Sequence, residues 1–233
     1  MTDDLAPVTA EALRERMRSA PVLAGPLPAF DPATAGPEPG PLFARWLAYA
    51  LDDGVPEPHA MTLSTADADG RPSARVLMLR GVDLGLPAFG FASDAASRKG
   101  RDLADRPHAA LSWYWPRHGR QIRVTGPVEA LDRSAARRDF LGRREVSRVA
   151  GFTGVMSAPL EGRPAYEEAR RRAAGHVAAH PDDVPRGHTV YRLVADEVEF
   201  WQAAPAQDHV RLLYTRDPAA PAPGGWTRGL LWP

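Results

Sequence analysis

Hydrophobic positions follow a period of two along most of the chain. This alternation runs through residues 59–67 and 72–82, and the Asp69-Gly70 pair between them is typical of a hairpin turn. It predicts further strands at 88–93, 108–117, 120–131, 189–202, 208–217 and 225–233. The pattern therefore favours a structure dominated by short antiparallel strands.

A second pattern, of helical spacing and helix-boundary residues, predicts helices at 9–20, 42–54, 97–107, 132–144 and 165–180. Thr9 is placed as an N-cap, and Gly54 lies where a glycine commonly ends a helix. Residues 21–41 are rich in proline and glycine, which predicts an extended arm or linker. We therefore expect an N-terminal arm over 1–40. Residues 41–233 are expected to form one domain, a small β-barrel with peripheral helices that is mainly β with α (α+β).

Composition narrows the class of protein. Of 233 residues, 44% are hydrophobic and 25% are charged, which excludes a wholly disordered or fibrous chain. The absence of cysteine excludes disulfides, thiolate catalysis, zinc–cysteine sites and iron–sulfur clusters. The net charge of +0 gives no reason to expect nucleic acid as a partner, and the histidine spacing predicts no metal site. The sequence contains neither a signal peptide nor an apolar run of ~20 residues, so we expect a cytoplasmic protein without a membrane partner.

Two groups of cations are candidates for an anion site. Arg75 and Arg80 lie five residues apart in one alternating run, so on an ideal strand they face opposite sides. They form either surface salt bridges or an anion site, since guanidinium binds phosphate bidentately. Ser97, Arg98 and Lys99 begin a predicted helix, where cations oppose the helix dipole. A phosphate bound there would resolve the mismatch, and the alternative is a solvated helix start.

Two later segments carry candidate ring and reaction contacts. Gln121 lies on the opposite strand face from Ile122, and we expect it to face the barrel interior. There a heteroaromatic ring would satisfy its amide, whereas an edge-strand glutamine would bind water. His209 and Arg211 share one strand face and together suit a bound anion or a reacting group, although a single histidine is more often structural. Trp201 is by default a core residue.

The ordered set of segments resembles the pyridoxamine 5′-phosphate oxidase family. The matching segments are HAMTLSTADADGRPSARVLMLRGVD, FASDAASRKGRDLADRPHAALSWYWP, RQIRVTGPVEAL, DEVEFWQ and HVRLLY. The resemblance covers about residues 38–233. It implies an FMN-binding split β-barrel that forms a homodimer, with FMN at the subunit interface.

The resemblance also implies which residues contact FMN. Arg75, Arg98 and Lys99, with nearby serines, correspond to the phosphate and ribityl contacts, and Gln121 to the contact with the isoalloxazine ring. The implied cofactor set is Arg75, Val76, Leu77, Met78, Leu79, Arg80, Ala92, Ser93, Ser97, Arg98, Lys99, Gln121, Ser157, Trp201 and Arg211. Met156 stands where the family has a glutamine, so one polar contact is missing.

The implied substrate set departs from the family. Where the vitamin B6 enzymes grip a substrate phosphate with Lys, Tyr, Arg and Ser, this chain has Arg80, Asp139, Arg143 and Ser147. Their Arg-x-His stretch is Gln207-Asp208-His209 here. Asp139 brings a negative charge toward a phosphate, which is unfavourable in a buried site. With the cofactor set kept and the substrate set altered, the chain is most similar to the branch of phenazine-biosynthesis FMN-dependent oxidases.

That branch implies a small-molecule substrate, here an acidic, dihydro-aromatic metabolite oxidised with dioxygen as the electron acceptor. His209 is the catalytic candidate. Three alternatives stay open. One is a true pyridoxamine/pyridoxine 5′-phosphate oxidase, one is a non-catalytic flavin- or haem-binding barrel, and one is a deazaflavin-dependent reductase on the same barrel.

Overall fold

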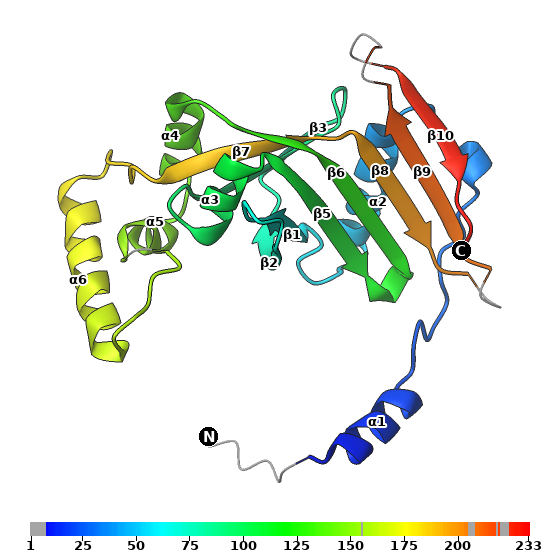
Figure 1. Cartoon of the computed structure of the whole chain (residues 1–233), viewed down its shortest axis with the longest axis horizontal. Coiled ribbons are helices and arrows are strands. Elements are labelled where there is room, and N and C mark those ends of the chain that lie inside the picture. The colour runs from blue at the N-terminus through cyan, green and yellow to red at the C-terminus, as the bar shows by residue number, and fades with distance from the viewer. Residues whose placement is uncertain (1–7, 155, 205–207, 218, 220–223) are drawn as a thin grey trace.

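The computed structural model describes residues 8–154, 156–204, 208–217, 219 and 224–233. These residues form six α-helices and ten strands of one curled antiparallel sheet (Figure 1). The helices are α1 (Ala10–Ser19), α2 (Pro39–Asp52), α3 (Arg98–Asp105), α4 (Arg133–Leu141), α5 (Glu145–Phe152) and α6 (Arg163–Ala179). The strands are β1 (Ala60–Ala66), β2 (Pro72–Met78), β3 (Gly81–Asp83), β4 (Ala88–Asp94), β5 (His108–Trp115), β6 (Arg120–Ala130), β7 (His188–Val194), β8 (Glu197–Gln202), β9 (Val210–Arg216) and β10 (Trp226–Leu230).

The sheet divides along its longest strand, β6. The main path runs β10-β9-β8-β6-β5-β1-β2, while the far end of β6 pairs with β7, which continues to β4 and β3. Gly126 lies where the two branches separate, and a Cβ atom there would come within 2.0 Å of the carbonyl oxygen of Val194. Only glycine allows the backbones of β6 and of the β7–β8 connection to approach this closely.

Helix α2 covers one face of the sheet, which we call the inner face. Its buried side chains include Phe43 and Trp46, spaced to lie on one side of a helix. Trp46 packs edge-on against Phe200 of β8 at 5.2 Å between ring centroids, and Phe43 packs against Trp113 of β5 at 5.1 Å. The opposite, outer face of the sheet has no helix packed on it in Figure 1.

The remaining helices lie at the periphery. Figure 1 shows α4, α5 and α6 gathered at one end of the sheet, with α1 standing away from it. Val149, Ala173 and Val177 form a small separate cluster between α5 and α6. Helix α1 buries none of its residues, and Thr9 caps it as predicted by accepting from the amide of Ala12. In the described part of the chain, no helix combines the length and hydropathy needed to cross a membrane.

Two predicted strands are each two strands in the structure. Residues 72–82 divide into β2 and β3, because the amide of Arg80 pairs with Gly90 rather than continuing the ladder to β1. Residues 189–202 divide into β7 and β8, where the amide of Asp196 bonds to the carbonyl of Thr125. In both runs the alternation persists while the backbone changes neighbours, so the prediction of single strands was wrong.

The sequence also missed two features of the helices. Helix α5 was not predicted, since only Val149 of its residues is buried and its apolar pattern is weak. Helix α2 begins at Pro39 rather than at residue 42, as proline suits the first turn of a helix. The predicted arm also contains a 3₁₀ turn at Pro32–Thr34.

Candidate functional site

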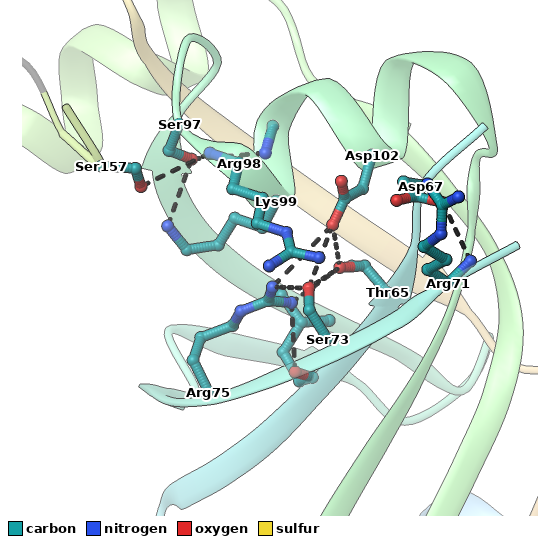
Figure 2. Close-up of polar contacts among 12 residues, drawn as sticks. Thr65, Asp67, Arg71, Ser73, Arg75, Ser97, Arg98, Lys99, Asp102 and Ser157 are labelled. Carbon is teal, nitrogen blue, oxygen red and sulfur yellow. Dashed lines mark hydrogen bonds and ion pairs between the residues drawn. The ribbon is translucent and has the colours of Figure 1, made fainter. Parts of the chain in front are cut away.

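The N-terminus of α3 gathers hydroxyl and ammonium groups. Ser97 caps this helix by accepting from the amide of Gly100 at 3.3 Å, and it donates to the carbonyl of Asp94 at 2.6 Å. Lys99, only 8% exposed, places its Nζ 3.1 Å from the Ser97 Oγ (Figure 2). Ser93 lies 3.4 Å from Ser97, hydroxyl to hydroxyl. These residues therefore concentrate polar groups at a helix end that favours anions.

Arg75 lies beside this group but is held by its own neighbours. Its guanidinium donates to the Thr65 hydroxyl at 2.8 Å and to Ser73, and it stands 3.9 Å from Asp102 (Figure 2). Burial, together with the positive charge of Arg75, lowers the pKa of Lys99. Arg75 thus adds positive potential to the site while its hydrogen-bonding fork is largely occupied.

The charge of Lys99 is incompletely balanced. Among the described residues, no carboxylate forms an ion pair with its Nζ, whose hydrogen-bond partners are the Ser97 hydroxyl and the sulfur of Met156 at 3.4 Å. Arg98 is exposed, and its amide donates to the Ser157 hydroxyl at 3.5 Å. A buried ammonium without a carboxylate is costly unless an anion reaches it, so these residues fit a phosphate group.

A second group of predicted residues lies on the outer face. Tyr114, Gln121, Trp201 and Arg211 are successive cross-strand partners on β5, β6, β8 and β9, so their side chains share one face. Gln121 is half-buried there, whereas Ile122 is 0% exposed in the core. The prediction that Gln121 faces the barrel interior was therefore wrong, because the hydrophobic residues of β6 take the inner face.

Arg211 is anchored on this outer face by a buried carboxylate. Its Nε donates to Glu199 at 2.8 Å, and Arg123 donates to the other oxygen of Glu199. Burial opposes ionisation of Glu199, but the hydrogen bonds from Arg211 and Arg123 outweigh it and lower the pKa of the carboxyl. The hydrogen bond to Glu199 in turn raises the pKa of Arg211. Both groups therefore stay charged and fix the position of the Arg211 side chain.

His209 lies next to Trp201, with 5.0 Å between the ring centroids. Its Nδ1 accepts from the amide of Ala204 at 3.2 Å, which orients the imidazole. His209 and Arg211 are thus joined through Trp201, which is the cross-strand partner of Arg211 and is half-buried on the outer face rather than in the core. Gln207 lies outside the described residues.

Four of the six predicted substrate residues line one cavity of about 610 Å³. Arg80 enters it from the β2–β3 connection, Asp139 from α4, Arg143 from the turn after α4, and Ser147 from α5. Other residues that line it are Glu57, His59, Met78, Arg138, Gly142 and Arg144. Four arginines against two carboxylates give this cavity a positive balance, which suits an anionic ligand.

Asp139 is compensated by two cationic or hydrogen-bonding partners. Arg143 donates to one of its oxygens through Nε at 3.0 Å and Nη2 at 2.7 Å, and Nε2 of His188 lies 2.8 Å from the same oxygen. Burial opposes ionisation of Asp139, but the hydrogen bond with His188 and the charge of Arg143 hold the pKa of the carboxyl below its usual range. The pair therefore occupies the guanidinium fork that was predicted to bind substrate.

Two groups of the predicted cofactor set, Arg75 and the row that contains Gln121, lie on opposite faces of the sheet. Arg75 pairs across the sheet with Leu63, and the same row continues through Leu111 to Val124. These three apolar side chains are buried on the inner face, so Arg75 points to that face as well. Gln121 and its row lie on the outer face. Strands β2 and β9 are separated by four others, which is roughly 24 Å along the sheet. One bound molecule cannot contact both groups within one chain.

Comparison with known proteins identifies the family. A family model described as pyridoxamine 5′-phosphate oxidase matches residues 47–179, more than half of the chain. The chain belongs to the pyridoxamine 5′-phosphate oxidase family. A second model, described as the pyridoxine 5′-phosphate oxidase C-terminal dimerisation region, matches residues 188–233, which contain β7 to β10.

Similar proteins carry two kinds of name. A protein of Burkholderia multivorans named pyridoxine/pyridoxamine 5′-phosphate oxidase is 44% identical over 206 residues, covering 88% of this chain and 93% of its own. One of the same name from Burkholderia cenocepacia is 41% identical over 204 residues, with the same coverage. The crystal structure of PhzG from Burkholderia lata, in complex with tetrahydrophenazine-1-carboxylic acid, is 32% identical with a TM-score of 0.79. It covers 90% of this chain and 100% of its own.

The match to PhzG confirms the predicted family and its split-barrel fold. An FMN-binding protein of Nostoc punctiforme, related to pyridoxamine 5′-phosphate oxidase, has a TM-score of 0.67 at 18% identity and shows the same fold. It covers 88% of this chain and 100% of its own. Members of the pyridoxamine 5′-phosphate oxidase family are oxidoreductases, and the chain is assigned to that class.

Sequence reasoning missed several residues of the site. His188 holds Asp139, which is 49 positions away in the sequence. Glu199 of β8 holds Arg211, which lies on the neighbouring strand β9. Arg138 and Arg144 line the cavity beside the predicted substrate residues. Their position next to Asp139 and Arg143 was the available signal, since i, i+1 neighbours at a helix end can border the same hollow.

Proposed function

We propose that the protein is an FMN-dependent oxidase of a small acidic, dihydro-aromatic metabolite, with dioxygen as the electron acceptor. The observation that carries this choice of substrate is the pairing of Asp139 with Arg143 and His188. Arg143 already binds Asp139 through two of its nitrogens, so its guanidinium fork is not free for the bidentate contact that a phosphate dianion favours. A carboxylate carries less charge, and the remaining arginines of the cavity suffice to bind it.

The residues at the start of α3 support FMN as the cofactor. Lys99, Ser97 and Ser93 would hold its phosphate, with Arg75 and the amide of Arg98 contributing positive potential. The exposed edge of β2 from Val76 to Leu79 would lie along the cofactor. When bound, FMN accepts two electrons as a hydride and is reoxidised by dioxygen.

A homodimer would complete the site. Gln121, Trp201 and Arg211 lie on the outer face of the sheet, too far from α3 to contact the same flavin within one chain. In a dimer, these three residues of the second copy would contact the flavin held at α3 of the first. The outer face has a hollow of about 410 Å³ with small side chains such as Ser64, Ala110 and Ser112, which would let a second copy approach closely. The match of residues 188–233 to a dimerisation region supports the same arrangement.

The chain's own groups would act on the substrate from two directions. Arg80 and Arg138 would bind its acidic group in the cavity. His209, oriented by the amide of Ala204, would orient the substrate or take a proton from it. Trp201, packed against the imidazole, would exclude water from that side.

A second candidate function is oxidation of pyridoxine or pyridoxamine 5′-phosphate. The names of relatives at 41–44% identity favour it. So does the compensation of Asp139, because the carboxylate repels a phosphate less once Arg143 and His188 neutralise it. The two functions differ in whether Arg143 is free to bind the substrate.

The test is anaerobic reduction of the purified protein. Flavin absorption near ~375 and ~450 nm is expected from a bound isoalloxazine. We expect tetrahydrophenazine-1-carboxylic acid, as a reduced aromatic acid, to bleach it and pyridoxamine 5′-phosphate to leave it yellow. Bleaching by pyridoxamine 5′-phosphate, and not by the reduced aromatic acid, would establish the second candidate function. A colourless protein that cannot be loaded with FMN would refute the cofactor.

The role of His209 is tested in the same assay. His209→Ala is expected to retain FMN, while the rate of bleaching falls by about 10²- to 10⁴-fold, the range typical of a lost general acid or base. Loss of FMN from this variant would contradict a role in substrate chemistry.

A further inference from the structure

Gln202 ends β8 in a fully engaged, buried position. It is 2% exposed, and its Nε2 donates to the carbonyls of His118 at 2.9 Å, Gly119 at 3.3 Å and Ala203 at 3.1 Å. Its Oε1 accepts from the Nε of Arg120 at 2.9 Å. One amide therefore ties the end of β8 to the turn between β5 and β6.

Arg120 depends on this amide. It is 7% exposed, and its guanidinium lies over the rings of Trp46 at 4.4 Å and Tyr49 at 5.1 Å. In the part of the chain that the structure describes, no carboxylate pairs with it, and burial lowers its pKa to about 10. Without Gln202, Arg120 would lose the acceptor of its Nε inside the core.

The anchored backbone leads directly to the predicted substrate residues. The amide of Ala203 donates to the carbonyl of Gly119 at 2.7 Å, and the next amide, of Ala204, donates to Nδ1 of His209. Trp201 precedes Gln202 and packs on the imidazole. Residues on both sides of Gln202 in the sequence, Trp201 and Ala204, therefore contact the imidazole of His209.

We infer that Gln202, held by Arg120, is a positioning residue that fixes His209 for the reaction on the substrate. This inference rests on the proposed function, because it takes His209 as the group that acts on the substrate. Gln202 itself lies behind the site and contacts backbone carbonyls. Its loss should therefore change turnover and leave FMN binding at α3 intact. Displacements of about 1 Å in a catalytic group can cost on the order of 10²-fold in rate.

The experiment compares Gln202→Leu and Gln202→Glu with Val177→Ala in the FMN-loaded protein. Leu removes the whole hydrogen-bonding group, whereas Glu keeps an acceptor for Arg120 and loses the donor to the three carbonyls. Val177 is buried in the separate α5–α6 cluster, so its variant matches a general loss of stability. Amide exchange of Ala203 and Ala204 and the ¹⁵N shift of His209 Nδ1 report the geometry without substrate.

We expect faster exchange at both amides and a changed His209 signal in the two Gln202 variants. We also expect kcat to fall about 10- to 100-fold, with the dissociation constant of FMN unchanged. Exchange, signal and kcat equal to those of Val177→Ala would overturn the inference, as would a loss of activity that only follows lost FMN. If the Leu variant does not fold, the Glu variant decides by the same readouts.

The spectroscopic arm separates this inference from the proposed function. If the His209 signal changes in the Gln202 variants but the protein oxidises no substrate, the positioning contact stands and the proposed function is refuted. If the protein is an active oxidase but its His209 signal is the same in the Gln202 variants, only the positioning role is refuted.

Discussion

Lys99 is the buried cation on which the cofactor proposal most depends. Lys99→Met keeps an unbranched side chain that ends one atom short of the ammonium, and it removes the charge. A buried charge-assisted hydrogen bond contributes about 1.5–3 kcal/mol, so we expect the dissociation constant of FMN to rise on the order of 10- to 100-fold. Quenching of flavin fluorescence on titration measures it.

The control for this variant is Arg101→Met. Arg101 is exposed on the same helix and donates to the carbonyl of Ala96, outside the predicted phosphate contacts. We expect its FMN affinity to equal that of the unmodified protein. Equal losses in both variants would mean that α3 contributes only general positive charge, and that the assignment of Lys99 is wrong.

Asp139 links the cavity proposed to bind the substrate to stability in acid. Because its folded-state pKa is lowered, the carboxylate stabilises the fold at pH values above the ordinary aspartate pKa of about 3.9. This contribution is lost as pH falls through the lowered folded value. Asp139→Asn is therefore expected to lower the free energy of unfolding near pH 7 by about 1–3 kcal/mol, and by less as pH falls below about 4.

Urea unfolding between pH 3 and pH 7 measures this difference. The control is Asp182→Asn, since Asp182 is exposed in its 3.6 Å pair with Arg137. A pH-independent difference between Asp139→Asn and the unmodified protein would show that His188 and Arg143 do not bind the ionised carboxylate.

At the scale of elements, the division of the sheet depends on Gly126. Gly126→Ala would place a Cβ 2.0 Å from the backbone oxygen of Val194, and neither strand can move without breaking its ladder. We expect a loss of about 1–3 kcal/mol or more in the free energy of unfolding. Gly229→Ala on β10 is the control, because a Cβ there meets nothing within 4 Å. Equal stability of the two variants would show that the branch point tolerates a side chain.

The same division limited what the sequence could predict. Hydrophobic alternation located the strands and the face that each buries, because the period records burial alone. It could not show that residues 72–82 and 189–202 change neighbours midway, since the alternation continues through both breaks. Gln121 was placed inside against this pattern, because a glutamine in mid-strand was expected to contact a bound ring. Ile122 and Val124, on the other face of β6, fill the core instead.

The site followed the same rule. Residues adjacent in sequence, such as Ser97, Arg98 and Lys99, could be grouped at once because one helix start holds them. The pairing of Asp139 with His188 spans 49 positions and could not be read from the sequence. Asp139 was therefore expected to repel a substrate, while the structure shows its charge directed at Arg143 and His188.

At the scale of the whole molecule, a flavin that contacts both Lys99 and the row containing Gln121 would require a second chain. In a twofold dimer, each flavin would take Lys99 from one copy and Arg211 from the other, so two complete sites would form. A monomer, or a dimer joined through another surface, would hold only incomplete sites. This arrangement makes a quantitative prediction for mixed dimers.

Mixing Lys99→Met with Arg211→Met is expected to restore the tight FMN binding that each variant alone has weakened. Random exchange gives half mixed dimers, each with one intact site of two, so about a quarter of the full FMN capacity should return. Mixing Lys99→Met with Ser97→Ala is the control, because both changes lie in the same half, and no mixed dimer then carries a site with both residues intact. Flavin absorbance after subunit exchange measures the recovery. If the mixture of Lys99→Met and Arg211→Met recovers no tight FMN binding, each chain builds its flavin site alone.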